Sequence, residues 1–122
     1  MEASEQRRKR VEEFVDAFEA RDLDRCLCFF TDDACVHFLG DDHAGKEALR
    51  SWLQERFDAN LRIVKLRGID VDGNRAILRG ELDSDRIRAW PASSISGIMT
   101  IEFEGDLFKD IEFGLGVIKR GS

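Results

Sequence analysis

The sequence predicts an α+β fold, in which helices come first and a run of antiparallel strands then forms the sheet they pack on. Near the start, apolar residues recur at the spacing of one helix face, at Val11, Phe14, Val15 and Phe18. After residue 60 the period of the apolar pattern falls from about 3.6 residues to about 2, which is typical of strands. The length of 122 residues suits one domain, so residues 1–122 are assigned to a single domain.

Three helices are predicted in the first half of the chain. The first spans residues 4–20 with Ser4 as its N-cap, and the second spans 23–30 with Asp22 as its N-cap. A polar turn at 31–33 leads into a strand over 34–39. The glycines and aspartates of 40–45 then predict a loop, and a third helix covers 46–57.

Antiparallel strands are predicted in the second half. The first covers 61–71 and is followed by a tight turn at Asp72-Gly73-Asn74, whose residues tolerate positive φ. Further strands cover 75–83, 94–104 and 107–114, and the tail 115–122 is predicted to extend the last strand before it frays. The stretch 84–93 is expected to be an irregular connection or an interrupted strand.

Three segments carry a family resemblance: VEEFVDAFEARDLD at 11–24, FFTDDA at 29–34 and GKEALRSWL at 45–53. They resemble SnoaL-like proteins of the nuclear transport factor 2-like superfamily, which includes ketosteroid isomerases and polyketide cyclases. The resemblance implies a cone-shaped fold, with about three N-terminal helices packed on a curved, mainly antiparallel sheet that leaves an open mouth. It also implies a homodimer.

The resemblance also argues against one reaction. Ketosteroid isomerases place a catalytic carboxylate on the first strand and use a tyrosine and an acid as oxyanion donors. Here Phe38 falls at the position of the base, Phe14 at that of the tyrosine and Met99 at that of the second donor, while Leu53 replaces a supporting tyrosine. A phenylalanine can neither take nor give a proton, so we exclude steroid isomerisation by that mechanism.

An apolar cavity remains as the predicted site. Its expected lining residues are Phe14, Phe18, Phe30, Phe38, Trp52, Met99, Ile101 and Phe103, with Trp90 placed either at the mouth together with Arg86 and Arg88, or as an anchor of its loop or of an interface. Two interpretations stay open: the aromatic residues simply fill the core, or they line a pocket for a small apolar molecule.

Two ionisable residues are candidate catalytic groups. His37 is a candidate general base because its pKa starts near neutrality, although strand alternation places it on the face opposite Phe38. Asp110 becomes a candidate acid if a bulge turns its strand face inward; otherwise Asp110 and Glu112 form a solvated face.

No metal site and no cofactor are predicted. Three cysteines, Cys26, Cys28 and Cys35, show no zinc-ligand spacing and are expected to be free thiols. The run Asp41-Asp42-His43 offers donor atoms without a diagnostic spacing.

The charge balance bears on the partners. The net charge of -6 disfavours nucleic-acid binding, which needs a basic face, and the short basic run at 7–10 is expected to be a solvated helix start. No apolar run is long enough to span a membrane, and no signal region opens the chain, so a cytoplasmic location is expected. Ile95, Ile98 and Ile111 are predicted on the outer sheet face, where a second copy of the chain would cover them.

Two functions follow as hypotheses. The first is a SnoaL-like cavity protein that binds a small apolar molecule and possesses isomerase, cyclase or hydrolase activity. The second is a non-catalytic binding or interaction module of the same fold. An ionisable group that points into the cone would favour the first hypothesis, and a wholly apolar lining would favour the second.

Overall fold

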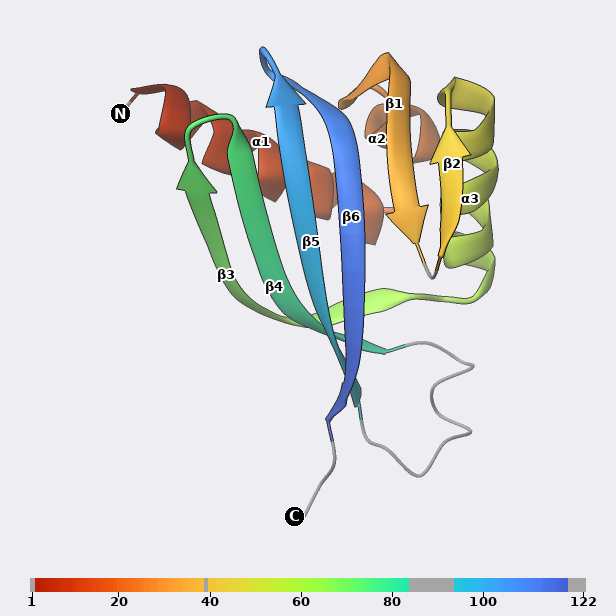
Figure 1. The fold of residues 1–122 in the computed structure, drawn as a ribbon. Coiled ribbons are helices and arrows are strands. Elements are labelled where there is room, and N and C mark those ends of the chain that lie inside the picture. Colours follow the sequence, from red (N-terminus) through yellow and green to blue (C-terminus); the bar gives the residue numbers. More distant parts are fainter. Residues whose placement is uncertain (1, 39, 84–93, 119–122) are drawn as a thin grey trace.

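The computed structural model describes residues 2–38, 40–83 and 94–118 (Figure 1). Its helices are α1 (Glu2–Glu19), α2 (Leu23–Leu27) and α3 (Lys46–Asp58), and its strands are β1 (Phe30–Phe38), β2 (Asp41–Ala44), β3 (Arg62–Asp72), β4 (Arg75–Asp83), β5 (Ser94–Glu104) and β6 (Leu107–Ile118). The strands form one sheet in the order β2-β1-β6-β5-β4-β3. Only the β1–β6 pairing is parallel among the described strands, which confirms the predicted α+β, mainly antiparallel fold.

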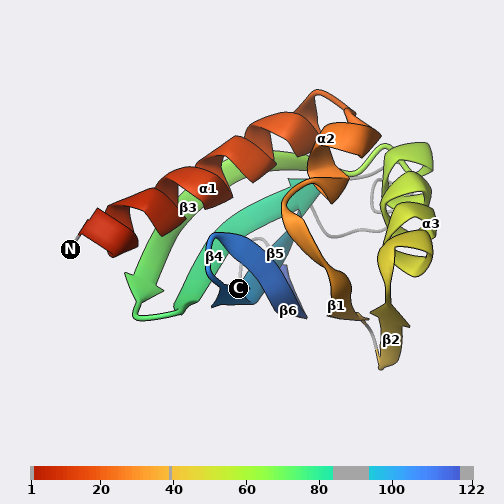
Figure 2. The ribbon, with the colours of Figure 1, turned by 90° about the horizontal axis from the view of Figure 1, so that it is seen from above.

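The sheet bends around the helices (Figure 2). Helix α1 packs against β3 and β4 at one side of the sheet, and α3 packs against β1 and β2 at the other. Helices therefore cover the inner face of the sheet on two sides, as in a cone-shaped fold. No described helix has both the length and the apolar character that a membrane crossing demands.

The start of α2 was predicted correctly and its end was not. Asp22 caps α2 by accepting the backbone N–H of Arg25 at 3.2 Å. The helix then ends at Leu27 instead of residue 30, because the next residues pair with a distant strand. The Phe108 N–H donates to the Phe29 carbonyl at 2.7 Å, and Phe30 lies opposite Phe108 in the β1–β6 ladder.

The polar turn predicted at 31–33 is part of β1. Between the pairs Phe30–Phe108 and Cys35–Asp110 the strand β1 advances five residues while β6 advances two. The intervening segment thus bulges out of the ladder but stays extended, and it exposes Asp32 and Asp33. The polar residues at 31–33 correctly predicted an irregular segment, but the segment is a bulge within a strand and not a turn.

Strand β2 replaces most of the loop predicted at 40–45. It pairs antiparallel with β1, and the hairpin turns at Gly40, which has φ of +84°. Three of its four residues are exposed, so β2 has no apolar alternation that would reveal it in the sequence.

The remaining strands follow the predictions closely. The bounds of β4 and β5 match them, β3 is shifted by one residue, and β6 continues past 114 to Ile118. The turn at Gly73, with φ of +60°, is confirmed. Residues 84–93, Leu39 at the end of the predicted strand 34–39, and residues 119–122 lie outside the described residues.

A bulge in β6 sets which residues face inward. Lys109 is the extra residue between the pairs Phe103–Phe108 and Glu102–Asp110. Phe108 and Ile111 can therefore both face the core although they are three positions apart, an odd spacing, and Asp110 is left on the outer face. The bulge suggested for this strand exists, but it does not turn Asp110 inward.

Two of the three isoleucines predicted on the outer face are buried instead. Ile111 is 0% exposed and Ile95 is 8% exposed, because alternation in β6 and β5 turns them inward. Ile98 does face outward and is 45% exposed.

The end of the inner face near the start of β1 is filled with aromatic rings. Phe108 is fully buried at the centre, with ring centroids 5.2–5.9 Å away. The surrounding rings are those of Phe14, Phe29, Phe30 and Phe103. Most of these pairs meet edge to face, an arrangement that adds to the burial energy. We call this group of five rings the closed end.

Candidate functional site

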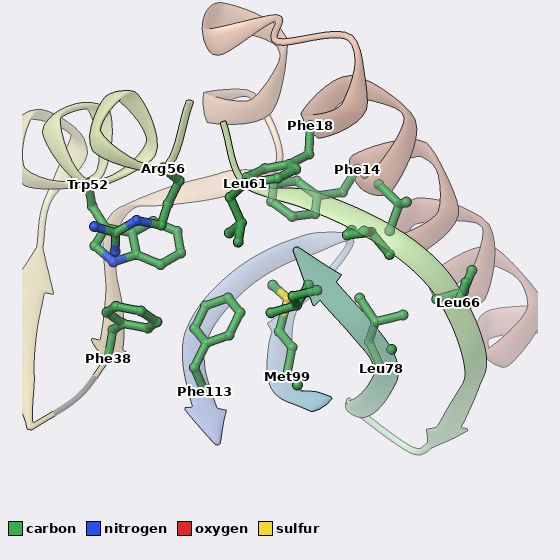
Figure 3. A pocket seen from close by; sticks show the side chains of 15 residues that line it. Phe14, Phe18, Phe38, Trp52, Arg56, Leu61, Leu66, Leu78, Met99 and Phe113 are labelled. Atoms are coloured by element: carbon green, nitrogen blue, oxygen red, sulfur yellow. The ribbon is translucent and has the colours of Figure 1, made fainter. Parts of the chain in front are cut away.

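An apolar pocket lies between α1, α3 and the inner face of the sheet (Figure 3). The cavity volume is about 70 Å³. A single water needs about 10–15 Å³ and a cavity that accepts benzene has about 150 Å³, so the hollow exceeds one water several times, and an organic ligand would have to extend from it or move its wall. Its wall consists of Phe14, Val15, Phe18, Phe38, Trp52, Arg56, Leu61, Ile63, Leu66, Leu78, Gly80, Leu82, Gly97, Met99 and Phe113.

Two glycines make the hollow possible. Gly80 of β4 and Gly97 of β5 lie opposite each other in the ladder, and both belong to the pocket wall. The inner face therefore lacks two side chains at this level of the ladder. At the next level, the facing residues Leu78 and Met99 fill the space. A Cβ added at Gly80 would lie 3.0 Å from the Lys65 carbonyl oxygen, so this glycine also permits β3 to approach β4 closely at its bulges.

Aromatic rings form one side of the pocket. Trp52 packs on Phe38 with ring centroids 5.5 Å apart and on Phe113 at 5.2 Å. Phe38 and Phe113 meet edge to face at 5.7 Å. These three side chains come from α3, β1 and β6, so the wall is built where these three elements meet.

The pocket wall has two polar features. The Arg56 guanidinium lies over the rings of Phe38 and Trp52, with its central carbon 4.7 Å and 5.3 Å from their centroids. Trp52 is 4% exposed, and its indole Nε1 has no hydrogen-bond partner within the part of the chain that the structure describes. A buried N–H without an acceptor is costly, and this one is covered by neighbouring atoms, so an oxygen of a bound molecule would reach it only if the surrounding side chains moved.

The residues predicted to line the pocket divide into two groups. Phe14, Phe18, Phe38, Trp52 and Met99 lie on the pocket wall. Phe30, Ile101 and Phe103 do not, because they belong to the packed core around the closed end and are 0–4% exposed. Trp90, with Arg86 and Arg88, falls outside the described residues.

The two candidate catalytic residues meet each other on the outer face of the sheet, away from the pocket. His37 Nε2 lies 2.8 Å from Asp110 Oδ1, and His37 Nδ1 lies 2.6 Å from Asp42 Oδ1. The hydrogen bonds to Asp42 and then Asp110 raise the pKa of His37 above its usual value. Phe38 faces the pocket and His37 faces away from it, as strand alternation requires.

The cysteines differ in environment. Cys26 is fully buried, and burial is the main cause that raises its pKa to about 12, with Asp22 adding to the effect. Cys35 lies 4.0 Å from His37 Nδ1, and its pKa is raised first by burial and then by Asp42 and Asp110. Cys28 is exposed.

Several wall residues were missed in the sequence. Leu78, Gly80 and Leu82 share the inward face of β4, and that alternation was a signal that could have identified them. Arg56 lies one helical turn after Trp52 on the same side of α3. The glycines gave no signal by themselves, because only strand pairing places Gly80 beside Gly97.

Comparison with known proteins agrees with this fold. The profile of the SnoaL-like domain matches residues 11–111. A candidate polyketide cyclase from Sinorhizobium meliloti superposes with a TM-score of 0.75 at 23% identity, over 87% of this chain and 94% of that chain. A candidate ketosteroid isomerase from Kribbella flavida gives 0.81 at 13% identity, over 98% and 84%. SalBIII, an epoxide hydrolase/cyclase-like enzyme in pyran ring formation of salinomycin, gives 0.79 at 17%, over 97% and 100%. A comparison with curated protein sequences finds no match.

Proposed function

Since the chain belongs to the SnoaL-like family, we propose that it binds a small, largely apolar molecule in the pocket between α1, α3 and the inner sheet face. The observation that carries the proposal is the composition of the wall, in which Arg56 is the one ionisable residue among the described residues that line it. Such a wall suits a ligand with an apolar body and few polar atoms.

The wall also explains why we favour binding over acid–base chemistry. General acid–base catalysis requires a titrating group within hydrogen-bond reach of the substrate. On the described part of the wall, carboxylates and histidines are absent, and the guanidinium of Arg56 stays charged. His37 and Asp110 lie on the opposite face of the sheet, so a role for them in catalysis would require a substrate at that outer surface.

Polar recognition is expected at one side of the ligand. The Trp52 Nε1–H and the Arg56 guanidinium are both donors. After a small shift of the side chains that cover these donors, a hydroxyl, carbonyl or carboxylate oxygen on the ligand would accept from them while the apolar body contacts the wall. This arrangement supports aromatic or alicyclic ligands that carry a single oxygen function.

The test is a thermal-shift screen of the protein with naphthalene, 1-naphthol and 1-naphthoate, repeated on a variant with a filled pocket. Gly97→Leu places a side chain into the hollow, whereas Ile98→Leu changes the next residue on the outer face and serves as the matched control. We expect the unfolding temperature to rise with 1-naphthol in the wild type and the control, and to stay constant in Gly97→Leu. An equal rise in all three proteins would contradict the proposal.

A second candidate function is enzymatic. It is supported by likeness in fold to a polyketide cyclase candidate and to SalBIII, whose descriptions name cyclase and epoxide hydrolase/cyclase-like activities. Among the described residues of the wall, a reaction of the isomerase, cyclase or hydrolase type would use Arg56 and the Trp52 N–H as donors that polarise an oxygen. Turnover of a bound epoxide that is lost in Arg56→Met and kept in Arg50→Met, a change of an exposed arginine on the same helix, would favour this function.

The homodimer also stays a proposal. The sequence predicted three exposed isoleucines on the outer sheet face as the contact surface. Of these three, Ile98 is exposed and the other two are buried, so less apolar surface supports a dimer there. Native mass spectrometry of the wild type and of Ile98→Lys tests it, with a dimer expected for the first and a monomer for the second. A monomer in both would overturn it.

A further inference from the structure

Four side chains that the pocket does not use meet on the outer face of the sheet. They come from three neighbouring strands, β2, β1 and β6, which lie side by side in Figure 1. Cys35 and His37 are two residues apart on β1 and so share a face. Asp42 pairs directly with His37 across β1 and β2, and Asp110 pairs with Cys35 across β1 and β6.

The donor atoms of this group are close enough to share one ion. Cys35 Sγ, His37 Nδ1 and an Asp42 carboxylate oxygen all lie within 4.8 Å of one another. The Sγ–Nδ1 distance is 4.0 Å and the Nδ1–Oδ1 distance is 2.6 Å. Ligand atoms around one tetrahedral zinc ion are about 3.3–3.8 Å apart, as bond lengths of about 2.0–2.3 Å imply. The two pairs that include His37 Nδ1 would therefore need to change by less than about one ångström, and the side chain of Asp42, 69% exposed, has room to move.

Asp110, the fourth residue of the group, is a second and independent indication of a metal site. Asp110 accepts from His37 Nε2 at 2.8 Å. A histidine that binds a metal through one ring nitrogen usually donates its other N–H to a carboxylate, which fixes the tautomer and the ring orientation. Because Asp110 holds Nε2, the other ring nitrogen, Nδ1, is available to bind an ion. Nδ1 is also the nitrogen that lies nearest to Cys35 and Asp42.

We propose that Cys35, His37 and Asp42 bind a zinc ion on the outer face of the sheet, with Asp110 as the residue that positions His37. Thiolate, imidazole and carboxylate together are the ligands of Zn²⁺ rather than of Mg²⁺ or Ca²⁺. Three protein ligands leave the fourth position to water. On binding, the thiol proton of Cys35 and the Nδ1 proton of His37 are released to solvent, and the Nε2 proton stays on His37, hydrogen-bonded to Asp110.

The charge of the surface favours a cation. Asp42 and Asp110 flank the group, and Glu112 pairs with His37 on the other side. The sequence pattern did not reveal the site, because Asp42 reaches Cys35 and His37 only through the β1–β2 hairpin, which was predicted as a loop.

Cobalt(II), which substitutes for zinc and absorbs visible light, gives the most direct test. Titration of the metal-free full chain with CoCl₂ should saturate at one ion per chain, with the visible bands of four-coordinate cobalt and a near-ultraviolet band from the thiolate–cobalt bond. ZnCl₂ should then displace the cobalt and abolish both signals.

Variants assign the ligands. Cys35→Ser should lose the thiolate band, and His37→Gln should lose stoichiometric binding. Asp110→Asn should keep the thiolate band and weaken binding about tenfold or more, which a purely structural role would not do. The matched controls are Cys28→Ser, which changes an exposed cysteine, and His43→Gln, which changes a histidine that lies near Trp52 instead.

Circular dichroism of each variant is the control for folding, and the two ligand variants test the site independently of each other. Absence of stoichiometric cobalt binding by the wild type would overturn the proposal. Binding that survives unchanged in both Cys35→Ser and His37→Gln would overturn it as well.

Discussion

The closed end and the pocket are two ends of the same inner face, and both are lined with phenylalanine. At the closed end four rings surround Phe108 and leave it fully buried. At the pocket end Phe38, Trp52 and Phe113 have equally close ring contacts, but the facing glycines Gly80 and Gly97 leave the middle empty. Aromatic content alone therefore does not distinguish a core from a binding site. What distinguishes them is the size of the inward-facing residues on the neighbouring strands, which are glycines at the pocket.

The largest expected effect comes from removing a ring at the closed end. Phe108→Ala should lower the free energy of unfolding by about 3–5 kcal/mol, because it creates a cavity in a packed region. Phe113→Ala enlarges a hollow that already exists and should cost less than half as much. Urea unfolding monitored by circular dichroism measures both, and equal losses would show that the two ends are packed alike.

Adding an atom at the glycine pair comes next in size. Gly80→Ala should cost about 1–3 kcal/mol, because its Cβ would lie 3.0 Å from the backbone oxygen of Lys65 and would push β3 away. Gly114→Ala is the control, since no atom lies within 4 Å of its Cβ position. The same urea unfolding experiment applies, and a neutral result at Gly80 would mean that the close approach of β3 to β4 is not needed.

Thiol labelling tests how tightly the region beside the closed end is packed. Cys26 is fully buried and its pKa is raised to about 12, so at pH 8 almost none of it is thiolate in the folded protein. We expect maleimide to label Cys28 at once and Cys26 only at the rate of unfolding. Fast labelling of Cys26, detected by peptide mass spectrometry, would indicate local opening of α2.

The smallest effect is expected on the outer face. His37 and its two carboxylate partners are more than a third exposed, so the ion pairs should contribute only about 0–1 kcal/mol without metal. Because the folded-state pKa of His37 is raised, the contribution is full below its usual pKa near 6.5 and is lost as the pH rises through the raised value. Groups that face it are Cys35, Asp42, Asp110 and Glu112. This contribution is measured as the difference in the free energy of unfolding between the wild type and His37→Gln, at several pH values and with a chelator present. A stability difference that grows as the pH rises would contradict the raised pKa of His37.

The sequence predicted the parts of the fold that local pattern controls. The strands β4 and β5 alternate cleanly, and their bounds were predicted to the residue. Asp22 identified the start of α2 through its capping side chain. Most errors fall where long-range pairing overrides local preference: at the end of α2, in the bulged start of β1 and in the exposed edge strand β2. Two others do not, since Ser4 lies inside α1 instead of capping it, and Ile95 and Ile111 were assigned to the wrong sheet face.

The site was less predictable for the same reason. Helical and strand periodicity showed that Phe38 and Phe103 both face inward, but it does not show how far along the cone each residue lies. Phe38 lies on the pocket wall and Phe103 beside Phe108, and the strand register decides between these places. The position of Arg56 over two rings likewise depends on the meeting of α3 with β1.

Met99 offers the most direct measurement of the pocket itself. The chain has two methionines, Met1 and Met99, and Met99 lies on the pocket wall. In protein labelled with ¹³C at the methionine methyl groups, titration with 1-naphthol should move the Met99 signal along a saturable curve and leave Met1 in place. In Gly97→Leu the Met99 signal should stay fixed. A wild-type spectrum in which Met99 does not move, or in which both methyl signals move together without saturation, would contradict a pocket that binds small apolar molecules.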